Sequence, residues 1–130
     1  GAARHHHRDA VARAALGPLS QVLRQDPDRH VREMAAFRLG LSQDGDQSLA
    51  ALATAFADEK DLCVRWAIFR FSVRAAGKDA LPQLQRFATL EPRLKADYDD
   101  FVAIYASGTT DFARVWQEKP ERIHCLAEGE

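Results

Sequence analysis

The stretch from residue 28 to residue 40 reads Asp-Arg-His-Val-Arg-Glu-Met-Ala-Ala-Phe-Arg-Leu-Gly. Its residues at three- and four-residue spacing fall on one helical face: Val31, Met34, Ala35, Arg38 and Leu39. Phe37 and Leu41 extend the apolar surface sideways. The spacing predicts a helix over about residues 29–42, ended by Gly40 and the Asp44-Gly45-Asp46 cluster. Asp46 is the expected N-cap of the next helix, over about 47–57.

The opening of this stretch returns once further along the chain. Asp28-x-x-Val31-Arg32 recurs as Asp61-x-x-Val64-Arg65, and each copy follows a segment with large apolar residues at helical spacing. These residues are Leu16, Leu19 and Leu23 before the first copy, and Leu49, Leu52 and Phe56 before the second. A third such segment leads into Leu94-Lys95, a weaker copy of Val-Arg. The pattern predicts a repeating unit of helix, short acidic turn and helix.

The segment from about 60 to 75 carries apolar residues on two sides. One stripe holds Val64, Ala67, Ile68 and Phe71, and a second holds Trp66, Phe69 and Val73. A helix that is apolar on two sides must be packed on two sides, so this helix is expected at the centre of a stack. No segment of useful length alternates as a half-buried strand does. We therefore predict an all-α superhelix of about three helical hairpins, with six to seven helices.

Length and composition fit one domain. The 130 residues are 46% hydrophobic and 28% charged, which is ordinary for a globular chain. Residues 1–8 contain His5, His6 and His7 and are treated as a disordered N-terminal segment or a tag remnant, which leaves 9–130 as a single repeat domain. Charged residues interrupt every apolar run before it reaches the length of a membrane span, so no membrane contact is expected.

The charge distribution disfavours nucleic acid as a partner. The net charge is −1, whereas nucleic-acid-binding domains are typically basic. Residues 60–95 are rich in Lys and Arg, and residues 96–130 are rich in Asp and Glu. We interpret both blocks as solvated surface that neutralises itself where the blocks adjoin.

The two cysteines lie far apart in unlike surroundings. Cys63 sits between Leu62 and Val64, as a buried small hydrophobe does, and Cys125 lies near the C-terminus. Two such residues do not form a disulfide framework, so we expect a reducing, cytoplasmic location.

The first repeat resembles the short HEAT-like repeat named after phycobilisome lyases. Its residues are Leu16-Gly17-Pro18-Leu19, then Asp26-Pro27-Asp28, then Val31-Arg32-Glu33-Met34-Ala35-Ala36, closed by Leu39-Gly40. The resemblance covers roughly residues 10–105 and weakens along the chain. It implies an α-solenoid in which turn aspartates and helix arginines form a ladder along the stack. Asp28, Arg32, Asp61 and Arg65 match those positions, and their implied role is structural.

Other polar residues do not combine into an active site. The three histidines at 5–7 are adjacent on a tail and make poor preformed metal ligands, and His30 suits a helix start. His124 and Cys125 are neighbours in sequence, which rarely gives the geometry of a nucleophile pair. Asp97, Asp99 and Asp100 are interpreted as a solvated face. We expect no catalytic residue, cofactor or metal.

A binding module is the favoured function. A solenoid presents a rigid helical surface to another protein, and the polar helix positions expected on it are Gln21, Arg24, Gln83 and Arg86. Trp116, near the end of the stack, either caps the core or meets a partner. A homo-oligomer held through an end helix is a further possibility.

The alternative is a HEAT-like enzyme or its accessory subunit, because bilin lyases and alkyl-purine DNA glycosylases resemble such solenoids. The glycosylases use a Trp, Asp and Arg constellation on a basic surface. Trp66, Arg70 and either Asp61 or Asp79 supply those residue types here. The short chain and its net negative charge favour the binding module instead.

Overall fold

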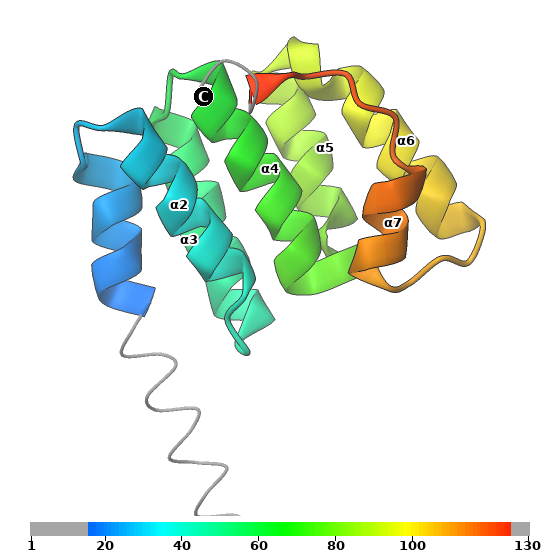
Figure 1. The fold of residues 1–130 in the computed structure, drawn as a ribbon, viewed down its shortest axis with the longest axis horizontal. Coiled ribbons are helices and arrows are strands. Elements are labelled where there is room, and N and C mark those ends of the chain that lie inside the picture. Colours follow the sequence, from blue (N-terminus) through cyan, green and yellow to red (C-terminus); the bar gives the residue numbers. More distant parts are fainter. Residues whose placement is uncertain (1–15, 126–130) are drawn as a thin grey trace, which may run out of the picture.

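The computed structural model describes residues 16–125, and these form a stack of helices that contains no strand (Figure 1). Residues 16–25 are helical. The elements that follow are α2 (Arg29–Gly40), α3 (Gly45–Asp58), α4 (Leu62–Ala76), the 3-10 turn η1 (Gly77–Ala80), α5 (Leu81–Leu90), the 3-10 turn η2 (Pro92–Leu94), α6 (Lys95–Ala106) and α7 (Phe112–Glu118). The all-α prediction is confirmed.

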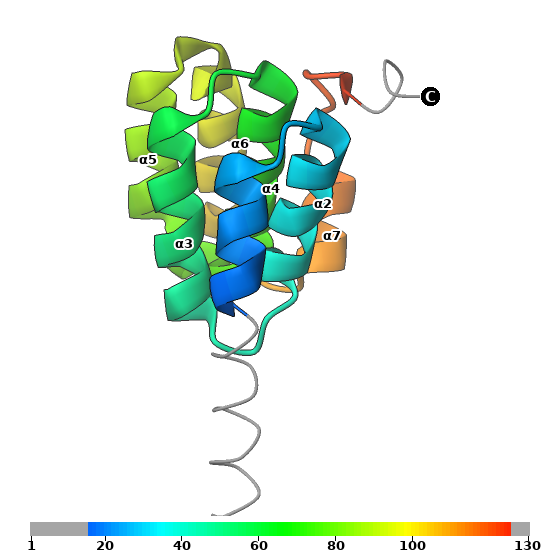
Figure 2. The same ribbon diagram turned by 90° about the vertical axis from the view of Figure 1, so that its left-hand side faces the viewer.

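Consecutive helices pair into hairpins. The helix 16–25 pairs with α2, α3 with α4, and α5 with α6, and the hairpins stack side by side (Figure 1). From hairpin to hairpin, α2 packs on α4 and α3 packs on α5. Figure 2 shows α3 and α5 together on one side of the stack and α2 with α7 on the other. This two-layered arrangement is the predicted helical solenoid.

Aspartates set the starts of four helices. Asp28 accepts the N–H of His30 at 2.8 Å, and Asp61 accepts those of Cys63 and Val64 at 2.8 and 3.1 Å. Asp44 caps α3 through the N–H of Gln47, and Asp111 caps α7. An N-cap satisfies backbone donors that a helix start leaves unpaired. The expected cap for α3 was Asp46, which is wrong: the helix begins two residues earlier, and Asp46 lies in its first turn.

Helix α4 is the central helix, as its two stripes predict. It contacts α2, α3 and α5, and both stripes are buried. Gly40 lets α2 approach it closely, because a Cβ built on Gly40 would lie 2.8 Å from the Cβ of Phe71. The Gly at the end of the first repeat is therefore required by helix packing.

The chain returns to α4 after α7. The residues from Lys119 to Cys125, here called the C-terminal segment, run back across the stack to the start of α4 (Figure 1). Among the described residues, no helix is long and apolar enough to cross a membrane.

Candidate binding groove

Helix α2 has a second apolar face that the described part of the chain leaves uncovered. Val31 is 39% exposed, Met34 52%, Phe37 39% and Leu41 47%. These four side chains, here called the α2 row, fall within one third of the helix circumference, while Ala35, Ala36 and Leu39 occupy the buried face. Single exposed apolar residues are normal, whereas four on one helical face are a candidate interaction surface.

Two members of the α2 row, Met34 and Phe37, line a cavity of about 360 Å³ between α2 and α4. Its volume is within the range of binding pockets. Its walls are mostly apolar, with polar groups at a few points. The lining residues are His30, Glu33, Met34, Phe37, Cys63, Trp66, Ala67, Arg70, Phe71 and Cys125.

A second cavity of about 260 Å³ lies on the other side of Trp66 and Arg70, between α4, α7 and the C-terminal segment. Trp66, Arg70 and Cys125 line both cavities. The remaining walls are Trp116, Lys119, Pro120, Glu121 and Ile123. We refer to the two adjoining cavities and the α2 row together as the groove.

Arg70 lies where the two cavities meet. Its guanidinium carbon is 3.9 Å from the ring centre of Trp116 and 5.0 Å from that of Phe71, which is cation–π geometry. Its Nε is buried and makes no hydrogen bond with residues 16–125. Burial lowers the pKa of the guanidinium, which nevertheless stays charged at neutral pH.

Trp116 is half-buried and belongs to an aromatic cluster. It lies 5.8 Å from Trp66, 6.2 Å from Phe112 and 6.5 Å from Phe101, ring centre to ring centre. Helix α7 therefore caps the third hairpin and, through the same indole ring, holds Arg70 in place.

Two carboxylates on the groove walls are each beside a histidine. Glu33 lies 3.8 Å from Nδ1 of His30, and Glu121 lies 3.1 Å from Nδ1 of His124. Burial raises the pKa of Glu33, although His30 opposes that shift. Neither carboxylate forms an ion pair with Arg70.

A buried ion pair holds the start of the C-terminal segment. Lys119 is 2% exposed and its Nζ lies 2.7 Å from Asp97, which is 1% exposed, and 3.0 Å from Asp100. Arg122 makes two further bonds to Asp100, at 2.6 and 2.9 Å. The hydrogen bond from Arg122 holds the pKa of Asp100 below its ordinary value. The interpretation of Asp97 and Asp100 as solvated is therefore wrong, and Asp99 alone of the three is exposed.

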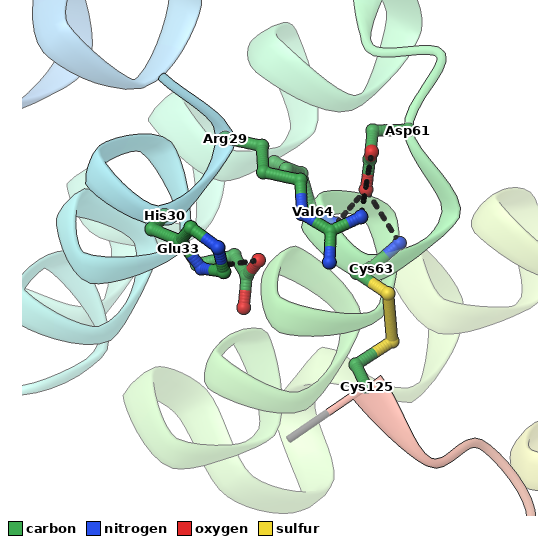
Figure 3. The surroundings of a disulfide bond; sticks show 7 residues. All are labelled: Arg29, His30, Glu33, Asp61, Cys63, Val64 and Cys125. Atoms are coloured by element: carbon green, nitrogen blue, oxygen red, sulfur yellow. Dashed lines mark hydrogen bonds and ion pairs between the residues drawn. A yellow bond between two sulfur atoms is a disulfide. The ribbon is translucent and has the colours of Figure 1, made fainter. Parts of the chain in front are cut away.

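A disulfide holds the other end of the C-terminal segment. Cys125 is bonded to Cys63 at the start of α4, beside Arg29 and Asp61 (Figure 3). The expectation that the two cysteines stay unpaired is wrong: the return of the chain to α4 brings their Cα atoms to 5.5 Å. Because disulfides are rare in a reducing cytosol, the cysteines no longer support the expected cytoplasmic location. A bonded Cys125 is also no nucleophile for His124.

The ladder between hairpins has different acidic members from those that the resemblance implies. Arg32 bonds the carboxylate of Glu59 in the next turn at 2.9 and 3.3 Å, and Arg65 bonds Glu91 at 3.2 Å. Asp28 and Asp61 act as helix caps, and Asp61 also meets Arg29 at 3.5 Å. Glu59 and Glu91 were not among the predicted residues, although Asp26 and Glu59 stand 33 residues apart, as the motif copies do.

The structure separates the other sequence-predicted residues from the groove. Gln21 and Arg24 lie on the helix 16–25, and Gln83 and Arg86 lie on α5, where they bond one another at 2.8 and 3.1 Å. None of these four lines either cavity, whereas Trp116 does. The three histidines at 5–7 are outside the described residues.

The structure brings together only part of the Trp, Arg and Asp set that resembles that of the glycosylases. Trp66 and Arg70 share the groove, but Asp61 caps the start of α4 and Asp79 lies in η1, beyond its other end. Neither aspartate forms an ion pair with Arg70. Within the described residues, no group of three or more His, Cys, Asp or Glu is placed to hold a metal ion.

Comparison with known proteins places the fold in a family. The family model described as HEAT repeats matches residues 16–102. The match covers more than half of the chain, so the protein belongs to the HEAT repeat family. Neither the curated proteins nor the solved structures gave a match. The family match supports the HEAT-like resemblance without distinguishing the phycobilisome-lyase type.

Proposed function

We propose that this chain is a protein-interaction module that binds another protein through the groove. The observation that carries the proposal is the α2 row, an apolar helical face whose Met34 and Phe37 line a cavity of about 360 Å³. HEAT repeat proteins are commonly interaction scaffolds, because their stacked helices form an extended rigid surface. The groove also contains Trp66, Arg70 and Trp116, the residue types that supply most of the binding energy at interfaces.

The shape of the groove favours a partner that inserts an apolar segment into it over a partner that presents a flat surface. Met34 and Phe37 contribute both to the exposed row and to the cavity wall, so a partner that covers the row also reaches the cavity. Phe37 and Phe71 are packed edge to face, 5.2 Å apart, which fixes the wall between α2 and α4. A rigid wall lowers the entropic cost of binding.

The polar surface made by Gln21, Arg24, Gln83 and Arg86 is the other candidate for partner contact. Figure 2 shows α5 on the side of the stack opposite α2. Gln21, Arg24 and Arg86 are exposed and Gln83 is half-buried, a composition that suits an ordinary solvated surface as well as an interface rim. Variants of the two surfaces can therefore be compared within one experiment.

The test is affinity capture from the native source with quantitative mass spectrometry. The bait is wild type, the Met34→Glu/Phe37→Glu variant or the Gln83→Ala/Arg86→Ala variant. We expect a set of proteins that is lost with the first variant and retained with the second. Loss with the second variant alone would assign binding to the polar surface, and capture that neither variant alters would contradict the proposal.

Light scattering distinguishes a second copy of the chain from a different partner. If the α2 row joins two copies, the wild type is a dimer and the Met34→Glu variant is a monomer. We expect both to be monomers, with the groove left free for a different protein.

A further inference from the structure

We infer that Arg70 is a carboxylate-binding residue, and that the groove accepts a peptide segment with an acidic side chain next to an apolar one. This inference rests on the proposed function and specifies the chemistry of the partner. The acidic side chain would meet Arg70 where the two cavities join, and the apolar side chain would lie against Met34 and Phe37.

Arg70 has hydrogen-bond donors that no residue among 16–125 uses, unlike the ladder arginines. Arg32 and Arg65 each bond a glutamate of the next turn and a backbone carbonyl of their own turn. Arg70, on the same helix as Arg65, has no carboxylate partner among residues 16–125, and its buried Nε lacks an acceptor. Because Nε itself is enclosed, a ligand would be bound through the terminal nitrogens of the guanidinium, which are also hydrogen-bond donors.

The second argument is that the guanidinium is held in place without being neutralised. Trp116 lies 3.9 Å from its central carbon and Phe71 lies 5.0 Å away, so aromatic rings restrain the group while its N–H edge keeps its hydrogen-bonding capacity. A planar fork that is restrained in this way suits bidentate binding of a carboxylate.

The third argument is the charge of the surroundings. Lys119 also lines the second cavity, but Asp97 and Asp100 already bind it. Glu33 and Glu121 each lie beside a histidine, and neither pairs with Arg70. Arg70 is thus the cation in the groove that has no acidic partner within the described residues, and charge complementarity selects an anionic group.

The apolar wall of the cavity favours a peptide over a nucleic acid as the anionic ligand. Met34, Phe37 and Phe71 line the cavity next to Arg70, and Met34 and Phe37 are also substantially exposed. Such a surface gains free energy only from an apolar group. A nucleic-acid backbone supplies the anion without an apolar neighbour, and the net charge of −1 disfavours it.

The experiment selects binders from a random linear peptide library displayed on phage, with the full chain as target. Selections are run in parallel on wild type, Arg70→Gln and Arg86→Gln. Arg86 is an exposed arginine on α5 and is the matched control. We expect wild type and Arg86→Gln to enrich peptides with Asp or Glu beside an apolar residue. Arg70→Gln should enrich apolar peptides without the acid.

The affinity of one enriched peptide then measures the contact. Replacing its acid by the corresponding amide should weaken binding to wild type by about tenfold or more, the usual effect of one charge-assisted hydrogen bond pair. The same replacement should have little effect on binding to Arg70→Gln. Circular dichroism establishes that Arg70→Gln is folded, and Arg70→Lys serves as a second variant that keeps the charge but loses the bidentate fork.

The possible failures are distinguishable. Enrichment of apolar peptides without an acid by wild type would overturn the role of Arg70 while leaving the proposed function intact. If no target enriches any peptide, both ideas fail. Binding of a labelled DNA duplex that requires Arg70, with no peptide enriched, would replace the carboxylate by a phosphate.

Discussion

Asp97 bonds Lys119 at the position where the two preceding hairpins carry a ladder arginine. Arg32 stands six residues after Asp26, Arg65 six after Glu59, and Asp97 six after Glu91. The third hairpin therefore reverses the charge at this position, and Lys119 supplies the missing cation from the C-terminal segment. Asp97 thus ends the ladder and fixes the segment that walls the second cavity.

The stability of the fold should be sensitive to substitution of Asp97, which pairs with the buried Lys119. Asp97→Asn should lower the free energy of unfolding by about 2–3 kcal/mol, because the buried Lys119 would lose its closest counter-ion and keep only Asp100. Urea denaturation measures this loss. Asp99→Asn is the control: its partner Lys95 is exposed, so the expected loss is below about 1 kcal/mol. Equal losses in the two variants would contradict the assignment.

The disulfide predicts that stability depends on redox conditions. Cys63 and Cys125 are 62 residues apart in sequence, and closing a loop of that length is worth about 4 kcal/mol in the chain-entropy model. Unfolding by urea should therefore occur at lower concentration after addition of a reductant. The Cys125→Ser variant should unfold at the same concentration with and without reductant. A wild-type protein that is insensitive to reduction would show that the pair contributes no stability.

Glu91 predicts a loss of stability in acid. Its hydrogen bonds from Arg93, and then from Arg65, lower its pKa from 4.5 to about 2 despite the opposing effect of burial. A carboxyl group whose pKa is lower in the folded state stabilises the fold above its unfolded pKa. That contribution disappears as the pH falls from about 4.5 towards 2. The free energy of unfolding of Glu91→Gln should change less over this range than that of wild type. The same pH slope in both proteins would contradict the prediction, and Glu121→Gln, an exposed position, serves as the control.

Substitution by alanine should have opposite effects on stability at two glycines, Gly40 and Gly17. Gly40→Ala places a Cβ 2.8 Å from the Cβ of Phe71 and 2.9 Å from its carbonyl oxygen, so α2 must move away from α4, at a cost of about 1–3 kcal/mol. Gly17→Ala places its Cβ in open space on a helix and should stabilise the fold by up to about 1 kcal/mol. Thermal unfolding measures both, and a stable Gly40→Ala protein would disprove the close approach of the two helices.

Most of the fold could be predicted from the sequence, because the signals that define it lie between residues close together in the chain. Helix periodicity and the 33-residue repeat of Asp61-x-x-Val64-Arg65 depend on neighbours in the chain, and they predicted hairpins that the structure contains. The two-sided helix around Trp66 was predicted correctly for the same reason.

The groove depends instead on contacts between distant residues, which periodicity does not reveal. Asp97 with Lys119 and Cys63 with Cys125 meet because the chain turns back after α7, and no repeat signals that turn. The stripe of Val31 and Met34 was visible, but spacing alone could not show that part of α2's apolar surface stays uncovered. Arg65 bonds a ladder glutamate, Glu91, in the turn that follows its helix, whereas Arg70 has no such glutamate. A search of that turn for the ladder partner of each arginine could have shown this difference.

Site-specific photo-crosslinking tests whether the α2 row and its cavity bind another protein. The photoreactive residue benzoylphenylalanine is placed at Met34 in one protein and at Gln85, an exposed position on α5, in the other. Both are irradiated in extract of the native source. We expect a discrete crosslinked protein from position 34 that is absent at position 85. A crosslink from position 85 alone, or none from position 34, would contradict it.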